Sequence, residues 1–172
     1  MTKKLALVTG GSRGIGAEIA KKLQKDGNEV VVSYIGRAEP AEKFTSETGI
    51  KNIKFDVSYF EDCQKAIKKI EEDYSQSIDI LINNAGITRD NLTLRMKEED
   101  WNDVINLNLN STFFLTKEIL RFMVKNRFGR IINISSVVGS SGNLGQANYA
   151  ASKAGLEGMT KSIALEVASR GI

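Results

Sequence analysis

The chain of 172 residues contains no histidine and one cysteine, Cys63. Without histidine there is no Ser-His-Asp triad, no Cys-His pair, no histidine metal ligand and no histidine general base. A single cysteine excludes an intramolecular disulfide and a cysteine-based zinc site, and no histidine is present to activate its thiol. So low a cysteine content is compatible with a reducing compartment, and we expect a cytoplasmic protein.

Long hydrophobic runs are also missing from the sequence. The first apolar run, Leu5–Val8, is too short for a signal peptide, and no stretch approaches the roughly 18 apolar residues of a membrane-spanning helix. Lys and Arg total 24 against 21 Asp and Glu, and the resulting net charge of +3 is spread evenly along the chain. The composition therefore predicts neither a nucleic-acid partner nor a membrane partner.

Short apolar runs alternate with longer amphipathic stretches along the chain. The runs are rich in β-branched residues and lack in-out alternation, which is typical of strands buried on both faces. Alternating strands and helices with right-handed crossovers predict an α/β fold, a Rossmann-like doubly wound parallel sheet, in a single domain over residues 1–172. The expected strands are Leu5–Val8, Val30–Val32, Ile53–Val57, Ile78–Ile82 and Ile131–Ile134, and the expected helices are Ala17–Gln24, Ala41–Thr48, Glu61–Tyr74, Lys97–Lys125 and Ala147–Ala168.

A glycine-rich segment, Thr9–Gly16, joins the first expected strand to the first helix. Gly10, Gly14 and Gly16 give it the spacing G-x-x-x-G-x-G. Glycines let the backbone approach a pyrophosphate closely, and the start of the following helix offers free N–H groups. The segment is not a P-loop, because Ala-Glu rather than Lys-Ser/Thr follows the last glycine. It predicts a dinucleotide-binding turn, with a glycine-rich connection that binds no ligand as the alternative.

The end of the second strand favours a phosphorylated dinucleotide. An acidic residue at this place binds the ribose 2′-hydroxyl of NAD, whereas an arginine nearby suits a 2′-phosphate. No acidic residue lies between Val30 and Ala38, and Arg13 and Arg37 are both available. We therefore expect NADP(H) rather than NAD(H); the alternative is that Arg37 is only a solvated loop charge.

Tyr149 and Lys153 are four residues apart on the last expected helix, so they share one face. A nearby ammonium favours the phenolate and makes the phenol a better proton donor. Such a pair also occurs by chance on many helix surfaces. Here it follows a strand that ends in Ser135 and Ser136, and residues at the carboxyl ends of parallel strands line the ligand crevice.

Four motifs in this order resemble the short-chain dehydrogenase/reductase family over most of the chain: Thr9–Gly16, Asn83–Gly86, Ser136 and Tyr149-x-x-x-Lys153. Within the family, residues 86–90, 129–131 and 145–150 resemble the bacterial 3-oxoacyl-[acyl-carrier-protein] reductases. The resemblance implies NADPH-dependent reduction of a 3-oxoacyl thioester in fatty acid synthesis. Another carbonyl substrate, such as acetoacetyl-CoA, a sugar or a steroid, stays open, as does an inactive nucleotide-binding fragment.

The resemblance also implies four catalytic roles. Tyr149 would protonate the carbonyl oxygen, Lys153 would bind the nicotinamide ribose, and Ser136 would hold the substrate oxygen. Asn108 would help to hold a water in a proton relay to Lys153. The following segment, Phe113–Thr116, selects Asn108 among three alternating asparagines.

The same resemblance places the cofactor along the carboxyl ends of the first four strands. Asn84 and Gly86 would lie beside it, and Asp56 and Val57 would meet the adenine at the end of the third strand. Asparagines that only form a turn, and an aspartate that only caps a turn near Ser58, are the alternatives. No metal is expected. The cofactor-binding residues implied are Gly10, Gly11, Ser12, Arg13, Gly14, Ile15, Gly16, Arg37, Asp56, Val57, Asn84, Ala85, Gly86, Tyr149 and Lys153.

Partners and chain length follow from the resemblance as well. Arg127 and Arg170 fall where the related reductases receive the acidic acyl carrier protein, with two solvated surface arginines as the alternative. In the related reductases the helices expected over 97–125 and 147–168 build a dimer contact, which implies a homo-oligomer, a tetramer at full length; the alternative is that the small residues of the second of these helices only pack on the sheet. The family's chain continues for roughly 70 further residues, so we expect the sheet to lack its last two strands and the substrate lid. The strand over 130–135 would then be an open edge.

Overall fold

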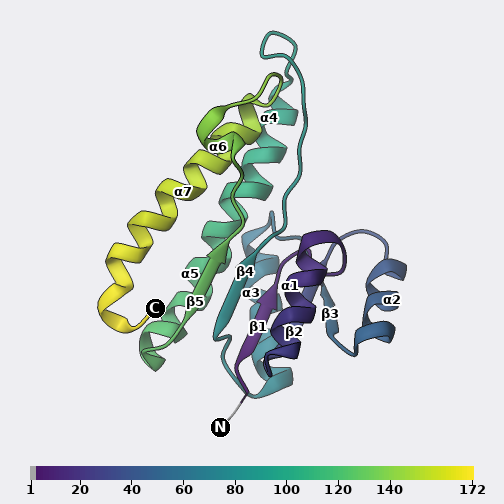
Figure 1. Cartoon of the computed structure of the whole chain (residues 1–172), viewed down its shortest axis with the longest axis vertical. Helices are drawn as coiled ribbons and strands as arrows, with labels where there is room; N and C mark the ends of the chain where they lie inside the picture. The colour runs from purple at the N-terminus through teal and green to yellow at the C-terminus, as the bar shows by residue number, and fades with distance from the viewer. Residues whose placement is uncertain (1–2) are drawn as a thin grey trace.

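The computed structural model describes residues 3–172. A parallel sheet of five strands lies at the centre of the fold (Figure 1). Its strands lie in the order β3-β2-β1-β4-β5, which confirms the expected doubly wound sheet. All neighbouring strands are parallel, so their carboxyl ends meet at one edge of the sheet. The strands are β1 (Leu5–Val8), β2 (Glu29–Tyr34), β3 (Lys51–Lys54), β4 (Ile80–Asn83) and β5 (Arg130–Asn133).

A helix follows each strand in the described chain. The expected helix over 97–125 is continuous in space but changes its hydrogen bonding in the middle, where a π-helical turn, Asn106–Asn110, separates two α-helices. A further short helix lies between the expected strand over 131–134 and the expected helix over 147–168, where no helix was predicted. The α-helices are α1 (Gly14–Lys25), α2 (Glu39–Thr48), α3 (Phe60–Tyr74), α4 (Glu98–Ile105), α5 (Ser111–Asn126), α6 (Val138–Ser141) and α7 (Ala147–Val167), and a 3-10 turn, Ala168–Arg170, follows α7.

Strand β1 shows why its sequence has no in-out alternation. Leu5 and Leu7 point to one face and join a core cluster with α3 and α5, whereas Ala6 and Val8 point to the other and pack with α1 and α2. All four are at most 1% exposed. Full burial of a leucine side chain stabilises a fold by about 2 kcal/mol, so apolar residues are favoured on both faces of a central strand.

The third strand differs from the prediction. Residues 53–57 were expected to be extended, but β3 ends at Lys54. Phe55 and Val57 are buried beyond the strand, in the cluster beneath α3. The chain turns at Asp56, whose carboxylate accepts the N–H of Ser58 at 2.9 Å. The apolar run therefore marks burial rather than strand pairing.

Strand β5 is an edge of the sheet in the described residues, since it pairs only with β4. Ile132 is 50% exposed there, which fits the expected open edge. On the opposite face of β5, α7 lies beside α5 (Figure 1), and the two helices share an outer groove. No helix within residues 3–172 is both long and apolar enough to cross a membrane.

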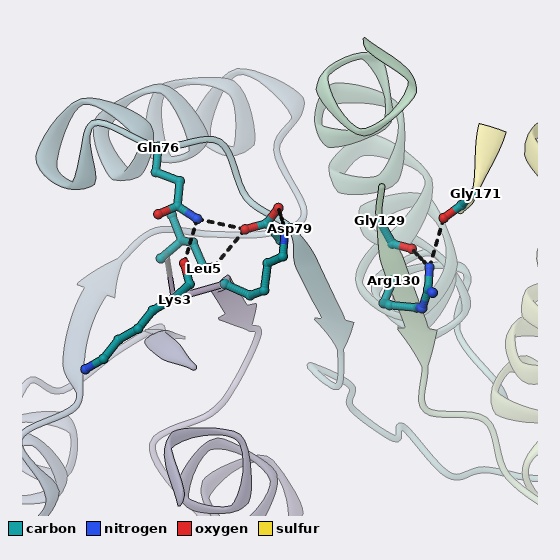
Figure 2. A network of polar contacts seen from close by, with 8 residues as sticks. Lys3, Leu5, Gln76, Asp79, Gly129, Arg130 and Gly171 are labelled. Carbon is teal, nitrogen blue, oxygen red and sulfur yellow. Dashed lines mark hydrogen bonds and ion pairs between the residues drawn. The ribbon is translucent and has the colours of Figure 1, made fainter. Parts of the chain in front are cut away.

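A buried carboxylate joins the starts of β1 and β4 at the amino end of the sheet (Figure 2). Asp79 accepts hydrogen bonds from the N–H of Leu5 at 3.0 Å and from Nε2 of Gln76 at 2.8 Å. Its other oxygen pairs with Lys4 at 3.4 Å. Figure 2 also shows Arg130, which donates to the carbonyl of Gly171 at 2.9 Å. These contacts fix the amino end of the sheet, and the carboxyl end carries the candidate site.

Candidate active site

The turn between β1 and α1 depends on glycine at several positions. Gly10 and Gly14 have φ angles of +61° and +56°, which residues with a Cβ rarely adopt. A Cβ on Gly16 would lie 2.6 Å from the carbonyl oxygen of Gly10. Arg13 precedes α1 and makes no side-chain capping hydrogen bond. The first N–H groups of α1 therefore lack a side-chain cap and can receive an anion.

Thr9 and Asn84 hold this turn against the loop that follows β4. The Thr9 hydroxyl accepts the N–H groups of Asn84 and Ala85, both at 3.0 Å. In return, Nδ2 of Asn84 donates to the carbonyls of Thr9 at 2.9 Å and Gly10 at 3.3 Å. The Ser33 hydroxyl, at the end of β2, accepts the Gly10 N–H at 3.2 Å. Three strand ends are thus joined by polar contacts around the glycine-rich turn.

A cleft of about 380 Å³ opens beside this turn, along the carboxyl ends of β1 to β4. It borders the π-helical turn through Leu107. Most of the expected cofactor-binding residues line this cleft. Gly11, Ser12 and Gly16 belong to the glycine-rich turn but do not line the cleft. The lining residues are Gly10, Arg13, Gly14, Ile15, Ser33, Tyr34, Ile35, Phe55, Asp56, Val57, Asn84, Ala85, Gly86, Ile87 and Leu107.

Two expected cofactor-binding side chains have distinct positions. Asp56 lines the cleft, where the cofactor is expected. Its carboxylate also accepts the Ser58 N–H, which is the contact expected of an aspartate that caps a turn. Arg37 is exposed beyond β2, two residues after cleft-lining Ile35, and is not part of the lining. Arg13 is the arginine that lines the cleft.

The π-helical turn places Asn108 between the cleft and α7. Its buried amide pairs with the backbone of Ile87 in both directions, accepting the N–H at 2.9 Å and donating to the carbonyl at 3.0 Å. Nδ2 also donates to the Ser152 hydroxyl at 3.2 Å. The neighbouring asparagines, Asn106 and Asn110, pair with each other at 2.8 Å on the exposed side. Asn108 is therefore the asparagine that joins the loop after β4 to α7.

Lys153 lies buried next to Tyr149 on α7. Its Nζ donates to the carbonyl of Ile134 at 2.6 Å and lies 5.6 Å from the centroid of the Tyr149 ring. Burial lowers the pKa of the Lys153 ammonium from its usual 10.5. The described residues supply it with no carboxylate partner within salt-bridge distance. The spacing of Tyr149 and Lys153 thus forms the expected contact, in a partly desolvated place.

Ser136 reaches the same region through the close packing of α6 on α7. Its hydroxyl accepts the N–H of Val138 at 3.3 Å at the start of α6. A Cβ on Gly139 would lie 3.0 Å from the backbone nitrogen of Ala154 and 3.1 Å from Cβ of Lys153. Because a Cβ there would press against the backbone of α7, the segment that carries Ser136 packs directly against the turn of α7 that carries Lys153. None of the four expected catalytic residues lines the cleft itself.

Comparison with known proteins decides the family. The family model described as short chain dehydrogenase matches residues 4–172. The chain belongs to the short-chain dehydrogenases. The 3-oxoacyl-[acyl-carrier-protein] reductases of Vibrio harveyi and Escherichia coli (strain K12) are each 50% identical to it over 171 residues, which cover 98% of this chain and 69% of each relative. The acetoacetyl-CoA reductase of Shinella zoogloeoides is 49% identical over 169 residues, 98% of this chain and 70% of that relative.

As a short-chain dehydrogenase, the protein uses a nicotinamide cofactor. The cleft fits such a group, because its glycine-lined wall exposes backbone N–H groups at the start of α1 for a pyrophosphate. Apolar residues such as Ile15 and Val57 line the same cleft and can pack against flat rings.

Sequence reasoning missed several residues that build this dehydrogenase site. Thr9 and Ser33 organise the glycine-rich turn, and Ser152 and Asn148 hold the backbone of Tyr149. Small hydroxyl residues at the ends of buried strands were a signal for the first two. No local pattern signals the other contacts of Ser152 and Asn148, because Asn108 and Arg89 are 44 and 59 residues away from them.

Proposed function

We propose that this short-chain dehydrogenase reduces the 3-keto group of a 3-oxoacyl thioester, carried on acyl carrier protein, with NADPH. The observation that carries the proposal is the buried Lys153 ammonium beside the Tyr149 ring, on a helix that Asn108 joins to the cleft-lining loop after β4. Identity of about half of all residues to reductases of this substrate supports the substrate class.

Each catalytic residue has a role that its position supports. The nicotinamide, when bound, supplies the hydride to the carbonyl carbon. Tyr149 gives its hydroxyl proton to the carbonyl oxygen, and the Lys153 ammonium stabilises the negative charge that remains on the phenol. The Ser136 hydroxyl donates to the same carbonyl oxygen as charge develops on it. Asn108 keeps the loop after β4 at a fixed distance from α7.

The phosphorylated cofactor is favoured by the charges around the end of β2. Arg13 lines the cleft, and exposed Arg37 is two residues from its wall. No acidic side chain lies on β2 beyond Glu29 or in the turn before Glu39, so nothing there would repel a 2′-phosphate. NADPH should therefore bind more tightly than NADH, with the difference falling as salt screens the arginine charges.

A second candidate substrate is acetoacetyl-CoA. The similarity to the Shinella zoogloeoides acetoacetyl-CoA reductase favours it. Both substrates are 3-oxoacyl thioesters, so the reacting atoms and the catalytic roles are the same. The two candidates differ only in what carries the acyl group.

Docking of an acidic carrier protein would use the basic end of α7. Arg170 is exposed there, and Arg127 donates to the carbonyl of Ser169 at 3.1 Å. Arg127 therefore also caps the end of the helix. Because α7 has 21 residues and rises about 1.5 Å per residue, Arg170 lies roughly 30 Å along the helix from Tyr149. Docking at Arg170 therefore fits delivery of the acyl group to the cleft of a neighbouring subunit.

An oligomer is consistent with the outer surface of α5 and α7. Apolar side chains gather in the groove between these helices, among them Phe113, which is 46% exposed, and Leu120, Val124 and Ile163. Exposed aromatic and aliphatic residues in a groove are typical of an interface. We propose that a second copy of the chain covers this groove.

The test is oxidation of NADPH, followed by absorbance, with acetoacetyl-CoA and with acetoacetyl-carrier protein. Turnover that Tyr149→Phe abolishes while NADPH still binds supports the proposed reaction. Cofactor binding without turnover of either thioester by the unaltered protein contradicts it and favours a nucleotide-binding protein without this activity. Arg170→Glu should raise KM for the carrier-bound substrate only, and Lys161→Glu, at an exposed residue of the preceding helix α7, is the matched control.

A further inference from the structure

Asn148 is completely buried beside the expected proton donor, and the proposed mechanism gives it no task. It is the second residue of α7, directly before Tyr149. A buried amide must have hydrogen-bond partners, because an unpaired polar group in a protein interior costs about 1–3 kcal/mol. Its partners therefore show what the amide connects.

The amide nitrogen of Asn148 joins α7 to two distant segments. Nδ2 donates to the carbonyl of Arg89 at 2.9 Å, in the loop after β4, and to the carbonyl of Asp100 at 3.1 Å, in the first turn of α4. Both amide protons are used. The loop after β4 begins with cleft-lining residues, so the amide links the start of α7 to the segment that forms one wall of the cleft.

The amide oxygen of Asn148 holds Tyr149 itself. Oδ1 accepts the backbone N–H of Tyr149 at 2.7 Å. This N–H is among the first of α7 and has no partner within the helix. The Tyr149 carbonyl accepts the hydroxyl of Ser152 at 2.7 Å, and this hydroxyl in turn accepts Nδ2 of Asn108 at 3.2 Å. Buried side chains therefore fix both backbone groups of Tyr149.

We propose that Asn148 is a positioning residue for Tyr149: it sets the backbone of the proton donor relative to the cleft and touches neither substrate nor cofactor. This inference rests on the proposed reductase function. An error of about 1 Å in the place of a reacting group can lower a rate about 100-fold. Loss of Asn148 should therefore act on the chemical step and leave cofactor binding intact.

The test compares Asn148→Ala and Asn148→Asp with the unaltered protein and with Asn143→Ala. Asn143 is an exposed amide in the preceding loop, and among residues 3–172 its side chain bonds to Gln146 alone, so it is a matched control. Turnover of acetoacetyl-CoA, NADPH affinity by fluorescence and the melting temperature are measured for each. We expect both Asn148 variants to lower kcat by about 10- to 100-fold, with the NADPH dissociation constant changed by less than about twofold, and Asn143→Ala to behave like the unaltered protein.

The aspartate variant adds a readout that a merely structural role would not move. One carboxylate oxygen can still accept the Tyr149 N–H. The other oxygen replaces the amide nitrogen, so it faces and repels the carbonyl oxygens of Arg89 and Asp100. When protonated, it regains one donor, so kcat of Asn148→Asp should recover as the pH falls toward about 5, and kcat of the unaltered protein should show no such recovery. A flat profile for this variant overturns the proposal.

Other outcomes are equally distinct. Unchanged kcat in both Asn148 variants overturns the positioning role while leaving the proposed function in place. Loss of NADPH binding in both variants shows a need for the fold instead and also overturns it. An unaltered protein that binds NADPH but reduces no thioester refutes the proposed function, and with it the role of Tyr149 on which Asn148 would act.

Discussion

Replacing Gly16 by alanine tests the crowding around the glycine-rich turn. The added Cβ would lie 2.6 Å from the carbonyl oxygen of Gly10 and 2.5 Å from Nδ2 of Asn84, where ordinary contacts begin at 3.4 Å. Gly16 is inside α1, so helix propensity alone predicts that alanine stabilises the protein by about 1 kcal/mol. Helix propensity and crowding therefore predict opposite signs for this substitution.

The crowding outweighs the propensity. Asn84 must move, and its two hydrogen bonds to the carbonyls of Thr9 and Gly10 weaken, at about 1 kcal/mol each. Forcing extra volume against backbone adds about 1–3 kcal/mol. We expect a net loss of about 2–4 kcal/mol in the free energy of unfolding. Because Asn84 lines the cleft, the affinity for NADPH should fall at least about tenfold.

Two further glycine variants separate crowding from backbone strain. Gly14→Ala and Gly27→Ala both place a Cβ at positive φ, +56° and +89°, with no atom within 4 Å. Each should lose only the strain of the left-handed conformation, about 1 kcal/mol. Gly14 lines the cleft, whereas Gly27 follows α1 at the opposite end of the sheet, so only Gly27→Ala should keep full NADPH affinity.

Urea unfolding and NADPH fluorescence measure both effects. The order of stability expected is unaltered protein, then Gly14→Ala and Gly27→Ala together, then Gly16→Ala. A Gly16→Ala protein as stable as the unaltered one would refute the reasoning, because the helix would then accommodate the Cβ without displacing Asn84.

Three further predictions concern buried groups. Burial raises the pKa of the Cys63 thiol from 9.0 to about 12, so the folded protein keeps a proton that the unfolded chain releases. The free energy of unfolding should therefore fall by about 1.4 kcal/mol per pH unit from pH 9 until the pH reaches the raised pKa, and Cys63→Ala should remove this part of the loss in urea unfolding at about pH 8 and pH 10. Asp79→Ala leaves the N–H of Leu5 without its acceptor and should lower the free energy of unfolding by about 2 kcal/mol, and a loss below about 0.5 kcal/mol would contradict this role. Burial lowers the pKa of the Lys153 ammonium, so this charge destabilises the folded protein at neutral pH. Lys153→Met should therefore unfold at a higher urea concentration while losing all turnover. A less stable variant would show that the hydrogen bond to the Ile134 carbonyl outweighs the cost of desolvation.

The sequence predicted the bounds of a strand correctly where both faces of the strand are buried. The first strand is found at Leu5–Val8 as expected, because burial on both faces selects a continuous apolar run. The third strand was misplaced by two residues at its start, because β3 is an edge strand with Lys51 and Lys54 exposed, and the apolar residues lie beyond it. Apolar runs indicate which residues are buried. At the edge of a sheet, the buried residues are not always the residues that pair with the neighbouring strand.

Within the long helix after β4, periodicity had no means of showing the π-helical turn. The three asparagines of this turn alternate with leucines in the sequence but differ in their surroundings, since Asn108 is buried and Asn106 and Asn110 pair with each other outside. Only the packing of α7 against this turn makes one of them a link between segments.

By itself, the sequence determined the alternation of strands and helices, the glycines that leave room for backbone or ligand, and the one-turn spacing of Tyr149 and Lys153. These properties depend on neighbours within a few residues, so local patterns encode them. The tertiary structure alone decided that the amide of Asn148 meets the carbonyl of Arg89, 59 residues away, and that Asn108 meets Ser152, 44 residues away. Contacts across such separations follow from how the helices pack on the sheet, which no local pattern specifies.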